Sequence, residues 1–168
     1  MSILEAVDAI RMKLEEEPGR AVVRLGAEAR LEEGMAVAVQ ARAFELAVDE
    51  PVSVGGTNTG PSPVQLVLAS LASCQAITYR YWSEFLGIRL DALTVQAEGD
   101  IDQRGLLGLA DGVPAGVTAV RVTITVEGPE RAERYEELRR AVDAHCPLLD
   151  IFTQALTVER ILEVAPSE

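Results

Sequence analysis

Residues 49–74, DEPVSVGGTNTGPSPVQLVLASLASC, decide how the rest of the chain must fold. The first half is dense in glycine and proline, which is typical of an ordered loop that redirects the chain. Ser62 and Pro63 then supply a helix N-cap and a first helical residue. The following pattern extends the helix to about residue 86. Its first half is apolar on almost every side, which predicts a helix that is buried all round.

The segments on both sides of this helix show strand and helix patterns. Alternation of apolar and polar residues predicts strands over residues 21–32, 35–42, 44–48, 88–103, 117–127 and 156–164. Helical spacing and capping residues predict helices over residues 2–16, 129–144 and 147–154. Adjacent strands with segregated helices favour an α+β fold with mainly antiparallel sheets. A second subunit is expected to cover the far side of the apolar helix.

Composition limits the class of partner. The chain has 168 residues, of which 48% are hydrophobic and 25% charged, and this suits a domain with a sizeable core. Lys and Arg number 15 against 27 Asp and Glu, which gives a net charge of −12. That charge argues against nucleic acid and against an anionic membrane as partners. Because no signal-peptide pattern or membrane-length apolar run is visible, we expect a soluble, cytoplasmic protein.

Two cysteines and one histidine are the candidate reactive groups, too few for a disulfide framework or a four-ligand structural zinc site. Cys146 precedes Pro147 and is predicted at a helix N-cap, where free N–H groups stabilise a thiolate. Cys74 lies mid-helix among apolar residues, on a narrow polar stripe with Ser70 and Thr78. Electrostatics alone makes Cys146 the stronger nucleophile. Each cysteine can also be interpreted as a small buried side chain.

Other polar groups beside these motifs have simpler interpretations. His145 adjoins Cys146, but it is expected to interact with the C-terminus of the preceding helix rather than to form a dyad. A Cys-Cys-His metal site would need a further ligand from elsewhere. Asp49 and Glu50 are acid–base candidates, although acids before a proline more often belong to a solvated turn.

Three segments together resemble the OsmC/Ohr family: residues 49–74, GIRLDALTVQAEGDID at 87–102, and HCPLLDIF at 145–152. The resemblance covers about residues 20–164. It implies an α+β fold built as an intertwined homodimer, in which strands of both chains wrap two long central helices. It also implies one domain over 1–168, with a helical extension (1–19), a β lobe (20–60) and a helix–strand lobe (61–168) that holds both cysteines.

The resemblance further implies a thiol-dependent peroxidase that reduces organic or lipid hydroperoxides in oxidative-stress defence, without a metal or organic cofactor. Cys74 matches the family's peroxidatic cysteine, which becomes a sulfenic acid. Cys146 matches the resolving cysteine, which forms a disulfide that a dithiol reductant reopens. An arginine assists the thiolate in the peroxidase branches. Arg42 is our first choice for this role, and Arg30 our second.

The family's peroxidase branches also carry a glutamate ten positions before the reactive cysteine, and Val64 stands there in this chain. Without that carboxylate the arginine would be held less firmly, and a higher thiolate pKa is expected. Two other functions therefore stay open. One is a non-catalytic protein that binds an apolar small molecule at the subunit interface. The other is a thiol redox sensor whose disulfide alters a partner contact.

Overall fold

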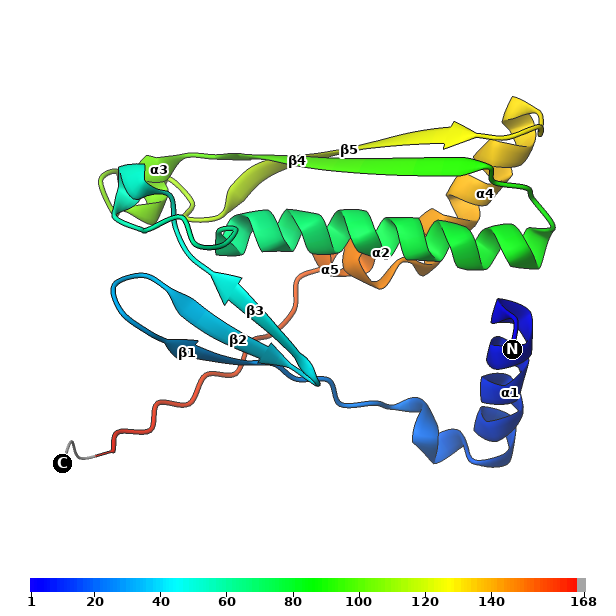
Figure 1. The fold of residues 1–168 in the computed structure, drawn as a ribbon, viewed down its shortest axis with the longest axis horizontal. Helices are drawn as coiled ribbons and strands as arrows, with labels where there is room; N and C mark the ends of the chain where they lie inside the picture. The colour runs from blue at the N-terminus through cyan, green and yellow to red at the C-terminus, as the bar shows by residue number, and fades with distance from the viewer. Residues whose placement is uncertain (166–168) are drawn as a thin grey trace.

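The structure, a computed structural model, describes residues 1–165 and combines two separate antiparallel sheets with one long helix and several shorter ones (Figure 1). The helices and strands are, in chain order, α1 (Ile3–Glu16), β1 (Glu28–Leu31), β2 (Val37–Ala41), β3 (Phe44–Val48), α2 (Pro63–Leu86), β4 (Ala92–Ile101), α3 (Gln103–Leu106), β5 (Val117–Glu127), α4 (Ala132–His145) and α5 (Pro147–Thr153). Single 3-10 turns span Pro18–Ala21 and Val52–Val54. This α+β architecture with antiparallel sheets confirms the predicted fold class.

Helix α2 begins and ends where the sequence predicts. The Ser62 hydroxyl accepts a hydrogen bond from the Gln65 N–H, and the Gln65 side-chain oxygen accepts one from the Ser62 N–H. This reciprocal cap satisfies two N–H groups that would otherwise lack partners. Pro63 occupies the first helical position, where its missing N–H costs nothing.

The core lies where α2 meets the β4–β5 ribbon, α4 and α5. Strands β4 and β5 pair antiparallel from Ala92 opposite Glu127 to Ile101 opposite Val117. The ribbon runs along one side of α2 (Figure 1). From α4, Leu138 and Val142 are fully buried against Tyr79 of α2. This packing fixes the junction between α4 and α5 relative to the middle of α2.

The loop that leads into α2 is built around Asp49, which is 1% exposed. Its carboxylate accepts hydrogen bonds from the backbone N–H and the hydroxyl of both Thr57 and Thr59, and from the Glu50 N–H. The hydroxyl of Thr57, more than any other group, holds the pKa of Asp49 well below its ordinary value. The expectation of a solvated turn at Asp49 is therefore wrong, because the loop folds back over this carboxylate.

Two glycines allow that loop to pass close to its own backbone. A Cβ atom on Gly56 would lie 1.8 Å from the Glu50 carbonyl oxygen, and one on Gly60 would lie 2.2 Å from the Ala47 carbonyl oxygen. Neither distance is possible for a real side chain. The two glycines therefore allow the loop to pack closely against the backbone of β3 and of the residues that follow it.

The strand predicted at 156–164 does not form in this chain, and the one predicted at 21–32 is confined to Glu28–Leu31. Residues 155–165 run in no regular structure from α5 past the three-stranded sheet (Figure 1). The apolar side chains of Leu156, Val158 and Leu162 are between 63% and 88% exposed. A strand needs a paired neighbour to satisfy its backbone groups, and the single chain offers none along these two segments.

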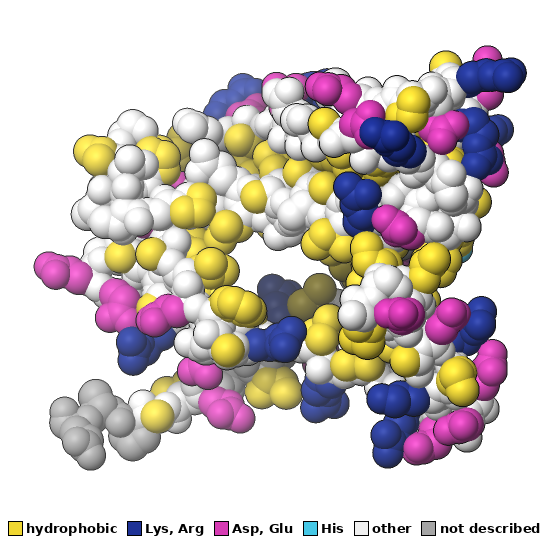
Figure 2. Space-filling view, turned by 45° about the vertical axis from the view of Figure 1, so that its right-hand side comes forward, with side chains coloured by type: hydrophobic (Ala, Val, Ile, Leu, Met, Phe, Trp, Pro, Cys, Tyr) yellow, Lys and Arg dark blue, Asp and Glu magenta, His cyan; other side chains and the backbone are white. Residues whose placement is uncertain are grey.

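The three-stranded sheet β1–β2–β3 stands apart from α2 (Figure 1). Its strands pair antiparallel, and only Val48 among their side chains is buried. Figure 2 shows an open hollow in the middle of the molecule, bordered in part by hydrophobic side chains and in part by Lys or Arg. None of the helices within residues 1–165 is both long enough and apolar enough to cross a bilayer.

Candidate functional site

The two cysteines, 72 positions apart in the sequence, meet at the junction of three helices. Cys146 Sγ lies 3.6 Å from Cys74 Sγ, and both thiols are free. A disulfide bond is about 2.05 Å long, so forming one would bring the two sulfurs closer by roughly 1.5 Å. The dithiol can therefore close without moving either helix far.

Cys74 lies at the border between the buried and exposed faces of α2. Leu71, Gln75 and Tyr79 face the core on either side of it, whereas Ser73 and Ile77 are exposed. Its side chain is consequently half-buried. Within the single chain Cys74 is therefore less enclosed than Cys146.

Cys146 occupies the predicted N-cap of α5, directly after the last residue of α4. Pro147 follows at the first helical position and sets the direction of the chain. The Cys146 side chain is only 1% exposed and belongs to the same core cluster as Leu138 and Val142. Its thiol donates a hydrogen bond to the Cys74 sulfur.

The surroundings of Cys74 hold its thiol above the usual pKa. Burial is the main cause that raises the pKa of Cys74, and the adjacent Cys146 thiol adds to it. The Leu148 backbone N–H and the Thr78 hydroxyl act in the opposite direction. Burial of Cys74 thus accounts for this direction, and the expected effect of the missing glutamate on the pKa stays a prediction. The Leu148 contribution was missed, although Pro147 at a helix start signals a free N–H on the next residue.

The candidate arginines lie on the three-stranded sheet. Arg42 forms the two-residue turn between β2 and β3 with a left-handed φ of 57°, and its carbonyl oxygen accepts a hydrogen bond from Gln40. Arg30 on β1 pairs with Glu32 at 2.7 Å. Within residues 1–165, neither arginine forms a hydrogen bond or ion pair with Cys74. Assistance from Arg42 stays a prediction.

His145 closes α4 as expected. Its Nδ1 atom lies 2.8 Å from the Ala141 carbonyl oxygen, and its ring stacks on Trp82 with a centroid distance of 4.3 Å. The ring therefore faces a carbonyl and an indole. In the part of the chain that the structure describes, no three His, Cys, Asp or Glu side chains gather as metal ligands.

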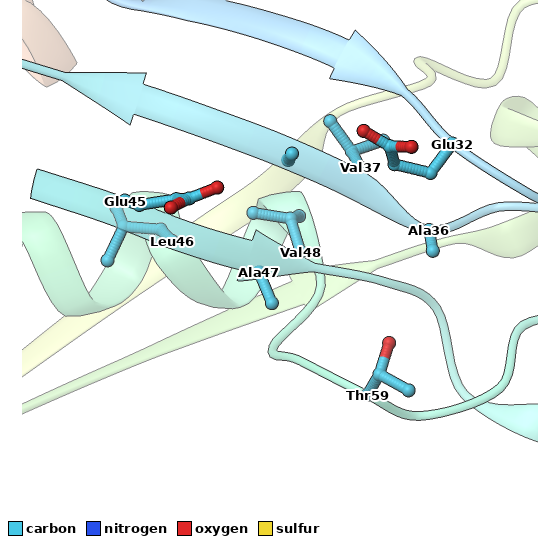
Figure 3. A pocket seen from close by; sticks show the side chains of 9 residues that line it. Glu32, Ala36, Val37, Glu45, Leu46, Ala47, Val48 and Thr59 are labelled. Atoms are coloured by element: carbon cyan, nitrogen blue, oxygen red, sulfur yellow. The ribbon is translucent and has the colours of Figure 1, made fainter.

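Two hollows could bind a small molecule, and neither is lined by a cysteine. One, of about 230 Å³, lies on the three-stranded sheet between Glu32, Glu45 and Thr59, and contains neither cysteine (Figure 3). The other, of about 360 Å³, is lined mainly by apolar side chains, including Leu71 of α2 and Leu149 of α5. Leu71 lies one helical turn before Cys74, but neither cysteine lines this second hollow.

A family model described as "OsmC-like protein" matches residues 56–160, which include both cysteines. The chain belongs to the OsmC-like protein family. No curated protein matches it. The family assignment agrees with the fold, with the capped helix α2 and with the late Cys-Pro helix start.

Solved structures share the OsmC-like fold at low identity. An OsmC-like protein from Mycoplasma pneumoniae superposes with a TM-score of 0.67 at 18% identity, covering 77% of this chain and 87% of that one. An organic hydroperoxide resistance protein from Elizabethkingia anophelis, with thiocyanate bound, gives 0.63 at 20% identity and covers 80% and 91%. A putative organic hydroperoxide resistance protein from Vibrio cholerae, with captopril in one active site, gives 0.58 at 20% identity and covers 79% and 86%.

Proposed function

We propose that this OsmC-like protein is a thiol-dependent peroxidase that reduces organic hydroperoxides with Cys74 as nucleophile and Cys146 as resolving cysteine. The observation that supports this most is the 3.6 Å separation of two free thiols from distant parts of the chain. Exposure supports the division of roles, because Cys74 is half-buried while Cys146 is 1% exposed. The structurally similar organic hydroperoxide resistance proteins support the substrate class.

The reaction proceeds in three balanced steps. The Cys74 thiolate attacks the terminal oxygen of the hydroperoxide, the O–O bond breaks, and the alcohol leaves with a proton. Cys146 then attacks the sulfur of the Cys74 sulfenic acid, a disulfide forms, and water leaves. A dithiol reductant supplies two electrons and two protons, becomes a disulfide itself, and restores both thiols. The apolar hollow beside Leu71 and Leu149 suits the organic group of the hydroperoxide.

The working unit in this proposal is a cytoplasmic homodimer. The outer face of α2 exposes Val67, Ile77, Tyr81 and Phe85, each between 42% and 59% exposed. Apolar side chains also border the open hollow of Figure 2. A second copy of the chain covers these surfaces, and Arg42 then approaches the partner subunit's Cys74 across the interface.

Peroxide consumption with a dithiol reductant tests the assignment. The Cys74→Ser variant is expected to lose turnover of cumene hydroperoxide, because no thiolate remains where peroxide has access. Cys146→Ser is expected to lose multiple turnover but to keep the first oxidation step. Thr123→Ala, on an exposed position of β5, is the control and should match wild type. If Cys74→Ser consumes peroxide as fast as wild type, the proposal is wrong.

A non-catalytic binding protein is the second candidate, favoured by Val64 in place of the family's glutamate and by the raised pKa of Cys74. It would show negligible turnover with both cysteines intact and would co-purify with an apolar ligand. A redox sensor would oxidise slowly and would not cycle with reductant. Turnover measured on the reduced wild-type protein, together with mass spectrometry of bound small molecules, separates the three functions.

A further inference from the structure

The proposed peroxidase cycle does not itself say which sulfur of the disulfide the reductant attacks. We propose that the reductant attacks Cys74 alone and that Cys146 is always the leaving sulfur. Every reactant from solution therefore meets Cys74, and Cys146 reacts only with Cys74. The inference rests on the proposed function for its reductant, but its basis is the unequal burial of the two sulfurs.

The burial of Cys146 comes from its own chain. Its 1% exposure results from packing in the cluster that contains Tyr79, Leu138 and Val142, which are themselves 2% exposed or less. All of these groups lie on α2 and α4, which pack together within one chain. Association with a second copy can add cover but cannot remove this cluster. A thiol from solution would have to open the core to reach Cys146.

Cys74, on α2, is less buried than Cys146. Within its own chain Cys74 is only partly buried, whereas Cys146 is 1% exposed, so only Cys146 is enclosed by its own subunit. Cys74 packs against the edge of the core cluster and is not one of its buried members. Because rates of thiol–disulfide exchange depend on access as well as on pKa, the difference in burial determines which sulfur is attacked.

Reduction of the disulfide takes place in two thiol–disulfide exchange steps. A thiolate of the dithiol reductant bonds to Cys74 Sγ, the Cys74–Cys146 bond breaks, and its electron pair passes to Cys146 Sγ, which takes up a proton. The second thiol of the reductant then attacks the reductant sulfur bound to Cys74. That step releases the reductant as a disulfide and Cys74 as a thiolate, which completes a two-electron reduction.

Mapping of the mixed disulfide tests this order in the wild-type protein. The protein is oxidised with diamide, exposed briefly to the monothiol 2-mercaptoethanol, quenched with acid and digested with trypsin. Residues 43–80 then carry Cys74 and residues 141–160 carry Cys146. We expect the adduct on peptide 43–80 in at least about tenfold excess, since access limits attack on the buried sulfur. Equal adducts, or an excess on peptide 141–160, would overturn the inference.

Single-cysteine variants give an independent measurement. With an aromatic disulfide reagent such as dithiobis(nitrobenzoate), Cys74 in the Cys146→Ser variant is expected to react at least about tenfold faster than Cys146 in the Cys74→Ser variant. In denaturant the two rates should become similar. Comparable rates in the folded variants would contradict the inference, and if a variant does not fold, the wild-type map decides. Diamide forms the disulfide without peroxide. A protein that lacks peroxidase activity can therefore still give the expected pattern of adducts, so failure of the peroxidase proposal can be told apart from failure of this inference.

Discussion

Asp49 illustrates how one side chain can organise the approach to a site without taking part in it. The carboxylate receives hydrogen bonds from two threonines and from the Glu50 N–H, and it is buried beneath the loop they form. That loop ends at Ser62, the cap of α2. The orientation of the helix that bears Cys74 therefore depends on a residue outside the dithiol.

Asp49→Asn is expected to lower the free energy of unfolding at neutral pH, because an amide loses the charge-assisted hydrogen bonds. The folded pKa of Asp49 lies below its unfolded value, so the ionised carboxylate stabilises the fold above about pH 4, and this stabilisation is lost as pH falls. The stability gap between wild type and variant should therefore narrow on acidification. Urea unfolding over a pH series measures this difference in the free energy of unfolding. A difference that does not change with pH would contradict the stabilising role of the Asp49 carboxylate.

Cys146 is expected to protect Cys74 from excess oxidation. The resolving sulfur lies 3.6 Å away, so it can intercept the sulfenic acid before a second peroxide arrives. In Cys146→Ser that interception is lost, and sulfinic acid should accumulate on residues 43–80 as peroxide is raised. Mass spectrometry of the tryptic peptides measures this. Equal sulfinic acid in wild type and variant would show that Cys146 does not resolve the intermediate.

Helix α4 fixes the position of Cys146. Its residues Leu138 and Val142 are fully buried, and the helix packs directly on α2. The same packing holds the two sulfurs at their observed distance. Loosening α4 should therefore disturb both stability and the chemistry of the dithiol.

Leu138→Ala is expected to lower the free energy of unfolding by about 2–5 kcal/mol, the usual cost of removing a buried leucine side chain. Leu109→Ala removes the same atoms from a side chain that is 71% exposed, and should change stability by less than about 0.5 kcal/mol. Denaturant unfolding of both variants gives the comparison. Similar losses would show that α4 does not hold the core as described.

The elements differ in how well the sequence predicts them, and pairing explains the difference. Local signals suffice for α2, whose capping residues and bounds were both predicted. The segments at 22–27 and 156–164 alternate like strands, yet they remain irregular because strand formation depends on a neighbour that the single chain lacks. The proximity of Cys74 and Cys146 was expected only through the family resemblance, since no local pattern reports a contact across 72 residues.

The exposed apolar surfaces of the single chain argue for a dimer. The outer face of α2 and the segment after α5 both carry exposed apolar side chains, among them Ile77 and Leu162, and hydrophobic side chains also lie along the hollow in Figure 2. Uncovered apolar surface of this extent is unfavourable in water. A second copy that covers it would also place the exposed side of Cys74 at a subunit interface.

If the proposed dimer forms through α2, Ile77→Asp is expected to leave the protein monomeric, because it places a charge on the exposed face of α2 where Ile77 is 59% exposed. Thr123→Asp, on an exposed position of β5, is the matched control and should remain dimeric. Light scattering after size-exclusion chromatography gives the mass. If wild type is monomeric, or Ile77→Asp has the wild-type mass, this α2 interface is wrong. Peroxidase turnover should fall with the dimer.

Counting thiols after a single addition of peroxide tests the dithiol mechanism most directly. One equivalent of cumene hydroperoxide added to the reduced protein should remove both thiols, and the intact mass should fall by two hydrogen atoms. Tryptic peptides 43–80 and 141–160 should then appear linked to each other. Two thiols that remain free after the peroxide has been added, or a disulfide between chains in place of the internal one, would contradict the mechanism.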